Sequence, residues 1–223
     1  MESSKSSDFR QRALLVVIFA FAMAYFESAA VVYLQRALDM TPQTIFPLRN
    51  QNSLGGLGGV EIGREAATLV MLATVGWIIG KRGLERLAWT AVAFGVWDIG
   101  YYFWLWVFIG WPTDLGDFDL LFLLPVPWVG PVLAPVVVSL ALIIFGLIVA
   151  KRLRTNYSVL AKARHFALLF VGGLVVILSF TIDAADTLHG AIPTTFAWPI
   201  FIAGMALAIA GVLPLCRTPF RGS

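Results

Sequence analysis

The chain has 223 residues, of which 59% are hydrophobic and 13% charged, whereas about a quarter of the residues in soluble globular domains are charged. This composition indicates a membrane protein and leaves no stretch long enough for a separate soluble core. The net charge of +3 does not indicate a nucleic-acid partner, because the basic residues lie in short runs beside apolar segments, where they orient spans. The lone cysteine, Cys216, excludes an intramolecular disulfide and any paired-thiol motif.

Six apolar runs of about 20 residues predict six transmembrane helices. The runs cover residues 13–34, 62–80, 87–110, 129–150, 166–188 and 194–215. None of them alternates as barrel strands do, and backbone polar groups must be paired in hydrocarbon, so we expect an all-α helical bundle. Residues 13–215 then form one transmembrane domain, with residues 1–12 and 216–223 as the tails.

The distribution of lysine and arginine predicts the orientation of this bundle. Thirteen of the sixteen basic residues fall in the two tails and in the loops after the second and fourth spans, whereas only Arg36 and Arg49 fall in loops on the other side. By the positive-inside rule, both tails are cytoplasmic, in a membrane of the bacterial inner-membrane type. Residues 36–60 and 112–128 are then extracytoplasmic, and residues 151–165 cytoplasmic.

The first span also matches a second interpretation. Basic residues before an apolar core, followed by Ala22-Met23-Ala24, are typical of a signal peptide with its cleavage site. The apolar run continues to Leu34, however, and this length favours a span that is retained.

Two further patterns concern loops and packing. The segment DLGDFDLLFLLPVPW, residues 114–128, is both apolar and acidic, so we expect either a lid over an outward-facing pocket or a surface loop. Small residues four or so apart predict close helix packing, at Gly76 and Gly80 and again at Gly204, Ala208 and Gly211.

Ionisable side chains inside apolar runs are costly in a membrane and mark functional sites by default. Their distance from the span ends places all but one of them in the outer half of the bilayer, with Asp98 about midway. The candidate catalytic residues are Glu27, Glu61, Arg64, Glu65, Asp98, Asp183 and Asp186. The candidate substrate-binding residues, which lie beside them, are Trp97, Tyr101, Tyr102 and His189. The inner halves of the spans are apolar, which favours a pocket open from outside over a continuous channel.

Charge balance gives this predicted site its chemistry. Six acids face one arginine, so either several acids are protonated or a cation, such as a divalent metal ion, occupies the site. Protonated carboxyls serve as general acids, clustered carboxylates hold hard metals, and aromatic walls stabilise an ammonium or a carbocation. The structural alternatives are an ion pair of Arg64 with Glu27, Asp183 or Asp186, a hydrogen bond from a tyrosine to Asp98, and an interfacial role for His189.

Two segments superficially resemble the acid-in-aromatic segments of the small integral-membrane terpene cyclases, which protonate polyprenyl substrates with buried carboxylates. The segments are FGVWDIGYYFW and SFTIDAADTLHG, and the resemblance implies acid roles for Asp98 and Asp183. It covers these two segments only and assigns no family.

The sequence thus favours a membrane-embedded enzyme that acts on a lipid or isoprenoid by acid–base or metal-assisted chemistry. Two alternatives remain. One is a non-catalytic subunit or assembly factor that docks membrane protein partners, a pigment or a lipid, and the other is a proton-linked transporter. The chain has no HExxH, GxSxG or Walker A motif that would identify a reaction.

Overall fold

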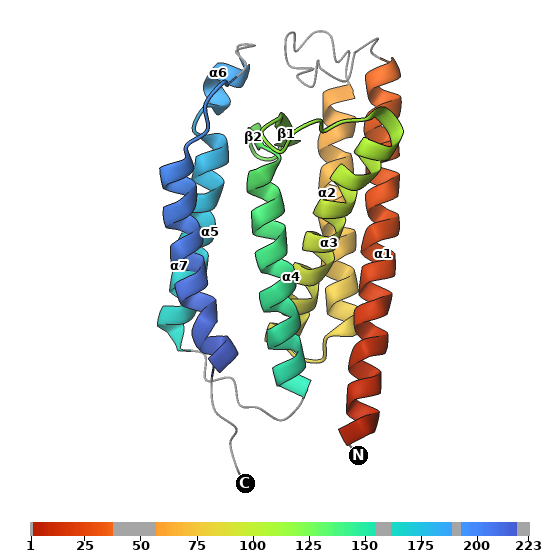
Figure 1. Ribbon diagram of the computed structural model, residues 1–223, viewed down its shortest axis with the longest axis vertical. Coiled ribbons are helices and arrows are strands. Elements are labelled where there is room, and N and C mark those ends of the chain that lie inside the picture. The colour runs from red at the N-terminus through yellow and green to blue at the C-terminus, as the bar shows by residue number, and fades with distance from the viewer. Residues whose placement is uncertain (1, 38–56, 155–161, 189–192, 218–223) are drawn as a thin grey trace.

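The computed structural model describes residues 2–37, 57–154, 162–188 and 193–217. Within these ranges, six helices are long and apolar enough to cross a membrane, and they run side by side along the long axis of the molecule (Figure 1). The first turn of the first helix and the last turn of the final helix lie at the same end of the bundle. The prediction of an all-α, six-span, multi-pass membrane protein is therefore confirmed.

The six long helices are α1 (Glu2–Ala37), α2 (Leu57–Ile79), α3 (Gly83–Ile109), α4 (Leu133–Arg154), α5 (Ala163–Thr181) and α7 (Trp198–Arg217). The short helix α6 (Ala184–Leu188) follows α5. Two strands, β1 (Phe118–Phe122) and β2 (Trp128–Pro131), form an antiparallel hairpin between α3 and α4.

Several helix ends differ from the predicted spans. The fourth helix begins at Leu133 rather than residue 129, because residues 128–131 form β2, and an apolar run does not by itself distinguish a strand from a helix. The fifth ends at Thr181 rather than residue 188, since the chain turns before α6. Helix α1 includes most of the predicted N-terminal tail, where Asp8 and Arg12 form a helical i, i+4 ion pair.

The faces of α1 show how the helices divide between the bundle and the membrane. Val16, Ala20 and Ala24 recur every fourth residue and are fully buried, so they form one stripe along the helix. Ile18 and Phe26 point elsewhere and are 56% and 76% exposed. Large apolar side chains exposed along a whole helix are suited to hydrocarbon, which supports the assignment of α1 as a span.

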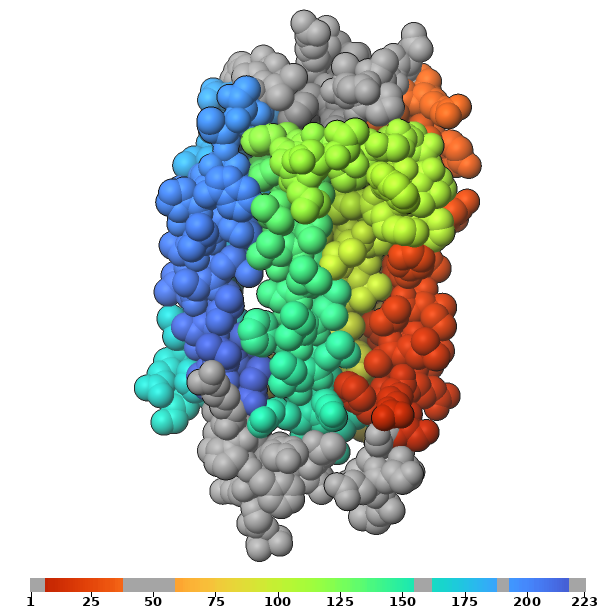
Figure 2. Space-filling model, viewed as in Figure 1, coloured from red at the N-terminus to blue at the C-terminus, as the bar shows by residue number. Residues whose placement is uncertain are grey.

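The long helices form two groups. Helices α1, α2 and α4 each pack on α3, whereas α5 packs mainly on α7. An apolar cleft of about 580 Å³ lies between the groups, lined by residues of α3, α4, α5 and α7, and Figure 2 shows an opening between α4 and α7.

Glycines allow the closest approaches within each group. A Cβ on Gly172 of α5 would lie 2.4 Å from the backbone nitrogen of Ala208 on α7, and a Cβ on Gly76 of α2 would lie 2.6 Å from the backbone nitrogen of Thr90 on α3. Because real Cβ atoms do not approach backbone so closely, both crossings require glycine. The predicted packing roles of Gly76 and of the small residues on α7 are confirmed.

The hairpin lies at the end of the bundle opposite the first turn of α1 and contacts both helix groups (Figure 1). The Trp128 ring stacks on Phe180 of α5 with 6.4 Å between centroids, and Gly130 packs directly against the same ring. On the other side, the ring centroid of Phe122 lies 6.1 Å from that of Trp97 on α3. Residues 114–128 were expected to form either a lid or a surface loop; within them, β1 packs on the helices, whereas residues 114–116 are exposed.

Candidate functional site

Arg64 of α2 is held between two carboxylates. It forms ion pairs with Glu27 of α1 and with Glu61 one turn earlier on its own helix, and its Nε donates to Glu61 at 3.0 Å. Glu27 also accepts a 2.9 Å hydrogen bond from the Thr68 hydroxyl. The expected pairing of Arg64 with a carboxylate of the first span is confirmed, and the pair ties α1 to α2.

Glu65 follows Arg64 directly on α2 and lies one turn beyond Glu61. Its carboxylate binds the hairpin rather than an arginine. The backbone N–H of Leu123, just beyond β1, donates to both of its carboxylate oxygens, at 2.9 and 3.1 Å. The Glu65 side chain is buried, so these bonds fix the end of the hairpin against α2.

Asp98 lies in the middle of α3 and is 5% exposed. The Ser139 hydroxyl of α4 donates to its Oδ2 at 2.8 Å. The expectation of a tyrosine partner for Asp98 is therefore replaced by a serine from another helix. Gly95, one turn before Asp98, lets α4 approach, since a Cβ there would lie 2.5 Å from the Ser139 carbonyl oxygen.

Asp119 of β1 is a fourth buried acid, which the sequence reasoning missed. Its side chain is 2% exposed, and its Oδ2 has no hydrogen-bond partner among the described residues. Burial raises the pKa of Asp119 to about 6, against hydrogen bonds from the Tyr102 side chain and the Leu120 backbone that lower it. The signal lay in the apolar acidic segment 114–128, for which a lid or a surface loop was expected but no site residue was named.

These side chains line one cavity of about 90 Å³. Its charged lining residues in the described part of the chain are Glu27, Glu61, Arg64, Glu65, Asp98 and Asp119. Its aromatic walls are Trp97, Tyr101, Tyr102, Trp111 and Phe122. The structure thus brings together eight of the predicted site residues, from α1, α2 and α3, and adds Asp119 from the hairpin.

Three of the predicted site residues are not brought to this cavity. Asp183, between α5 and α6, is half-buried and Asp186 of α6 is exposed, and neither lines the cavity. His189 lies outside the described residues. Depth along a span places a residue on the membrane axis only, and α5 packs on α7 rather than beside α1 and α2.

The donor set around the cavity determines which chemistry it supports. In the parts of the chain that the structure describes, no three histidine, cysteine, aspartate or glutamate side chains are arranged to hold a metal ion. Arg64 and the Leu123 backbone already engage three of the five carboxylates. Asp98 and Asp119 are the two carboxyls left to exchange a proton or to neutralise a cation.

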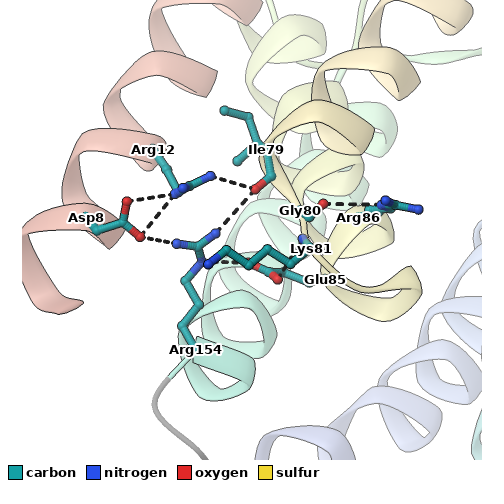
Figure 3. A network of polar contacts seen from close by, with 8 residues as sticks. All are labelled: Asp8, Arg12, Ile79, Gly80, Lys81, Glu85, Arg86 and Arg154. Atoms are coloured by element: carbon teal, nitrogen blue, oxygen red, sulfur yellow. Dashed lines mark hydrogen bonds and ion pairs between the residues drawn. The ribbon is translucent and has the colours of Figure 1, made fainter.

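A second polar network joins four helices at the opposite end of the bundle (Figure 3). Arg154, near the end of α4, donates from Nε to Glu85 of α3 at 2.6 Å, pairs with Asp8 of α1, and donates from Nη2 to the Ile79 carbonyl of α2. Sequence reasoning missed this network, because its acids lie near helix ends and resemble solvated charges. It fixes the helix ends without lining the cavity.

Comparisons with known proteins yield no match: no family model, no curated protein and no solved structure matches the chain. The function is therefore argued from the geometry of the cavity.

Proposed function

We propose that the protein is a membrane-embedded enzyme that acts on a lipid or isoprenoid by acid–base chemistry. One observation carries this proposal: two buried carboxyls, Asp98 and Asp119, line one cavity. Arg64, the one arginine on its wall among the described residues, is already paired. Carboxyls in such surroundings are readily protonated and act as general acids or bases near neutral pH.

The proposal gives the remaining side chains distinct roles. Asp98 and Asp119 exchange the proton with the substrate, and the Tyr101 and Tyr102 rings shape the wall beside them. Glu65 is a positioning residue, because it holds the hairpin that carries Asp119. Arg64 with its two glutamates fixes the neighbouring ends of α1 and α2.

The interior of the bundle beyond Asp98 supports an enzyme over a transporter. The buried side chains between Asp98 and the Arg154 network form an apolar cluster, among them Val16, Ala20, Trp89 and Val92. A transported proton or ion needs polar groups along its whole route. The cavity therefore has an apolar floor, which suits chemistry on a substrate that enters and leaves on one side.

Lipid turnover tests the proposal directly. The purified protein is reconstituted in vesicles of extracted membrane lipids with added polyprenols, and the lipids are followed by mass spectrometry. We expect one lipid or isoprenoid to be consumed, and Asp98→Asn to slow its loss by about a hundredfold or more. Asp114→Asn, at an exposed position just before the strand that carries Asp119, is the matched control and should leave turnover unchanged.

Other outcomes of this experiment contradict the enzyme proposal. Unchanged lipids, together with partner proteins that co-purify at fixed stoichiometry, would identify a subunit or assembly factor. Proton flux across the vesicles that Asp98→Asn abolishes would identify a transporter.

We further infer that both tails face the cytoplasm of a bacterial inner-membrane type of bilayer. The support is the basic asymmetry: Lys81, Arg82 and Arg86 lie in and just after the α2–α3 connection, and Lys151, Arg152 and Arg154 at the end of α4, which is the same end of the bundle as the first turn of α1.

Labelling with a membrane-impermeant maleimide tests this orientation in a Cys216→Ser background. We expect Leu115→Cys, at an exposed position in the connection between α3 and β1, to be labelled from outside intact cells. Gly83→Cys, exposed at the start of α3 with open space around its Cβ, should be labelled only after lysis. The reverse pattern would invert the topology.

A further inference from the structure

Acidic side chains outnumber basic ones on the wall of the cavity. Five carboxyls and one guanidinium line it within the described residues. Arg64 balances Glu27 and Glu61 only in part, and Glu65 is stabilised by neutral backbone N–H bonds. Asp98 has one neutral partner, the Ser139 hydroxyl. A positive group in the cavity would offset this excess.

Asp119 indicates where such a group would bind. Its Oδ2 is buried and has no hydrogen-bond partner among the residues that the structure describes, and Asp119 lines the cavity. A buried carboxylate oxygen without a partner carries its full desolvation cost, so native proteins rarely leave one unpaired. The missing partner is a donor or a cation on the cavity side of Asp119.

The walls and the size of the cavity narrow the chemistry of that partner. Trp97, Tyr101, Tyr102 and Trp111 present aromatic rings around the cavity, and aromatic faces attract cations, above all alkylated ammonium groups. The volume of about 90 Å³ is several times what one water molecule requires. It accommodates an ammonium with small substituents.

The position of the cavity indicates that a lipid carries this group. Val31 and Leu34 of α1 lie on its wall beside Glu61 of α2, and α1 and α2 make few contacts with each other. The neighbouring side chains Tyr33 and Val60 are 72% and 67% exposed. An alkyl chain attached to the ammonium can leave the cavity along this seam into the hydrocarbon.

We propose that the cavity binds the ammonium group of a cationic or zwitterionic lipid, with Asp98 and Asp119 as counter-ions and the aromatic rings as its walls. This inference deepens the proposed function by naming the headgroup chemistry of the substrate. Ammonium binding is measured without lipid turnover. A failure to bind the ammonium therefore does not imply that the enzyme proposal fails, and the reverse also holds.

The test uses the purified full chain in a neutral detergent at about pH 8, with dodecyltrimethylammonium as the probe. Its affinity is measured from the fluorescence of the tryptophans, two of which line the cavity, and from the shift in the thermal unfolding midpoint. We expect it to bind at least about tenfold more tightly than uncharged dodecanol. Tetramethylammonium, the same cation without a chain, should bind more weakly by a similar factor.

Variants assign the binding to the cavity. Asp119→Asn and Asp98→Asn, each made separately, should weaken dodecyltrimethylammonium binding by about tenfold or more, whereas Asp114→Asn should leave it unchanged. Two single variants are used so that a folding defect in one leaves the other informative. Equal affinity for dodecanol, or undiminished binding by both variants, would overturn the ammonium site. Equal affinity for tetramethylammonium would overturn the lipid as its source.

Discussion

At the scale of single residues, Arg64 illustrates a charge that is costly to remove. It is partly buried and paired with Glu27 and Glu61. We predict that Arg64→Leu destabilises the protein by about 3 to 5 kcal/mol, because both carboxylates lose their counter-charge inside the bundle. Thermal unfolding in detergent measures the change, and Arg36→Leu, at an exposed position near the end of α1, is the control.

The same pairing makes a second variant informative. Adding Glu27→Gln and Glu61→Gln to Arg64→Leu should recover much of the lost stability, because no charge then remains unpaired. If the triple variant is no more stable than Arg64→Leu, the loss arises from packing rather than from unpaired charge.

Asp119 gives the protein a pH dependence of stability. Burial raises its pKa from 3.8 to about 6, so between these values the folded state binds more protons than the unfolded state. Stability therefore falls as pH rises through this window. We predict that the wild type loses about 1 kcal/mol relative to Asp119→Asn between about pH 5 and pH 8.

The comparison removes the Asp119 carboxyl and keeps the other ionisable groups on the cavity wall. Those groups are Asp98, Tyr101 and Tyr102 of α3, Glu61, Arg64 and Glu65 of α2, and Glu27 of α1. Unfolding midpoints recorded across this pH range measure the difference between the two proteins. Parallel curves for the wild type and Asp119→Asn would show that Asp119 titrates normally.

At the scale of elements, substitutions at two adjacent glycines of α5 distinguish the effect of helix packing on stability from that of helix propensity. Gly172 faces the backbone of α7, whereas a Cβ at Gly173 meets nothing within 4 Å. We predict that Gly172→Leu destabilises the protein by about 3 kcal/mol, because it forces α5 away from α7. Gly173→Leu should be neutral or slightly stabilising, since leucine favours a helix. Equal effects in thermal unfolding would contradict the close crossing.

The elements also show what hydrophobic patterns predict. All six spans were predicted, because a run of about 20 apolar residues matches the thickness of the hydrocarbon core of a membrane. The hairpin was not predicted, since Val129, Gly130 and Pro131 continue into the apolar run of α4 without a change of composition. Only the pairing of Asp119 with Gly130 and of Leu120 with Val129 distinguishes strand from helix there.

At the scale of the whole molecule, the Arg154 network joins α1, α2, α3 and α4 at the end remote from the cavity (Figure 3). The Arg154 side chain is 10% exposed and Glu85 is 3% exposed. We predict that Arg154→Gln destabilises the protein by about 3 kcal/mol, because it leaves Glu85 buried without its ion pair. Arg10→Gln, at an exposed position on α1, should change thermal unfolding little.

Ligand binding in the cavity should not change in Arg154→Gln, because an apolar layer separates the network from the cavity. At a temperature where Arg154→Gln is folded, its affinity for dodecyltrimethylammonium should match that of the wild type. A change of more than about tenfold would show that the network and the cavity are coupled.

The sequence by itself determined that this is a six-span helical membrane protein. It also placed the intramembrane acids toward the same ends of the spans. These properties follow from composition and from the length of apolar runs, which are local quantities. It also indicated Glu27, Asp183 or Asp186 as partners of Arg64, since all are rare charges at similar depth, and the structure shows Glu27 as the partner.

Only the tertiary structure decided which acids share a site. Asp183 and Asp98 look alike in sequence, each an acid in an apolar run, yet α5 pairs with α7 and removes Asp183 from the cavity. Asp119 looks like a loop residue, yet the hairpin places it in the cavity wall. Depth is set along the chain, whereas the helix packing and the strand pairing that bring side chains together depend on contacts between distant segments.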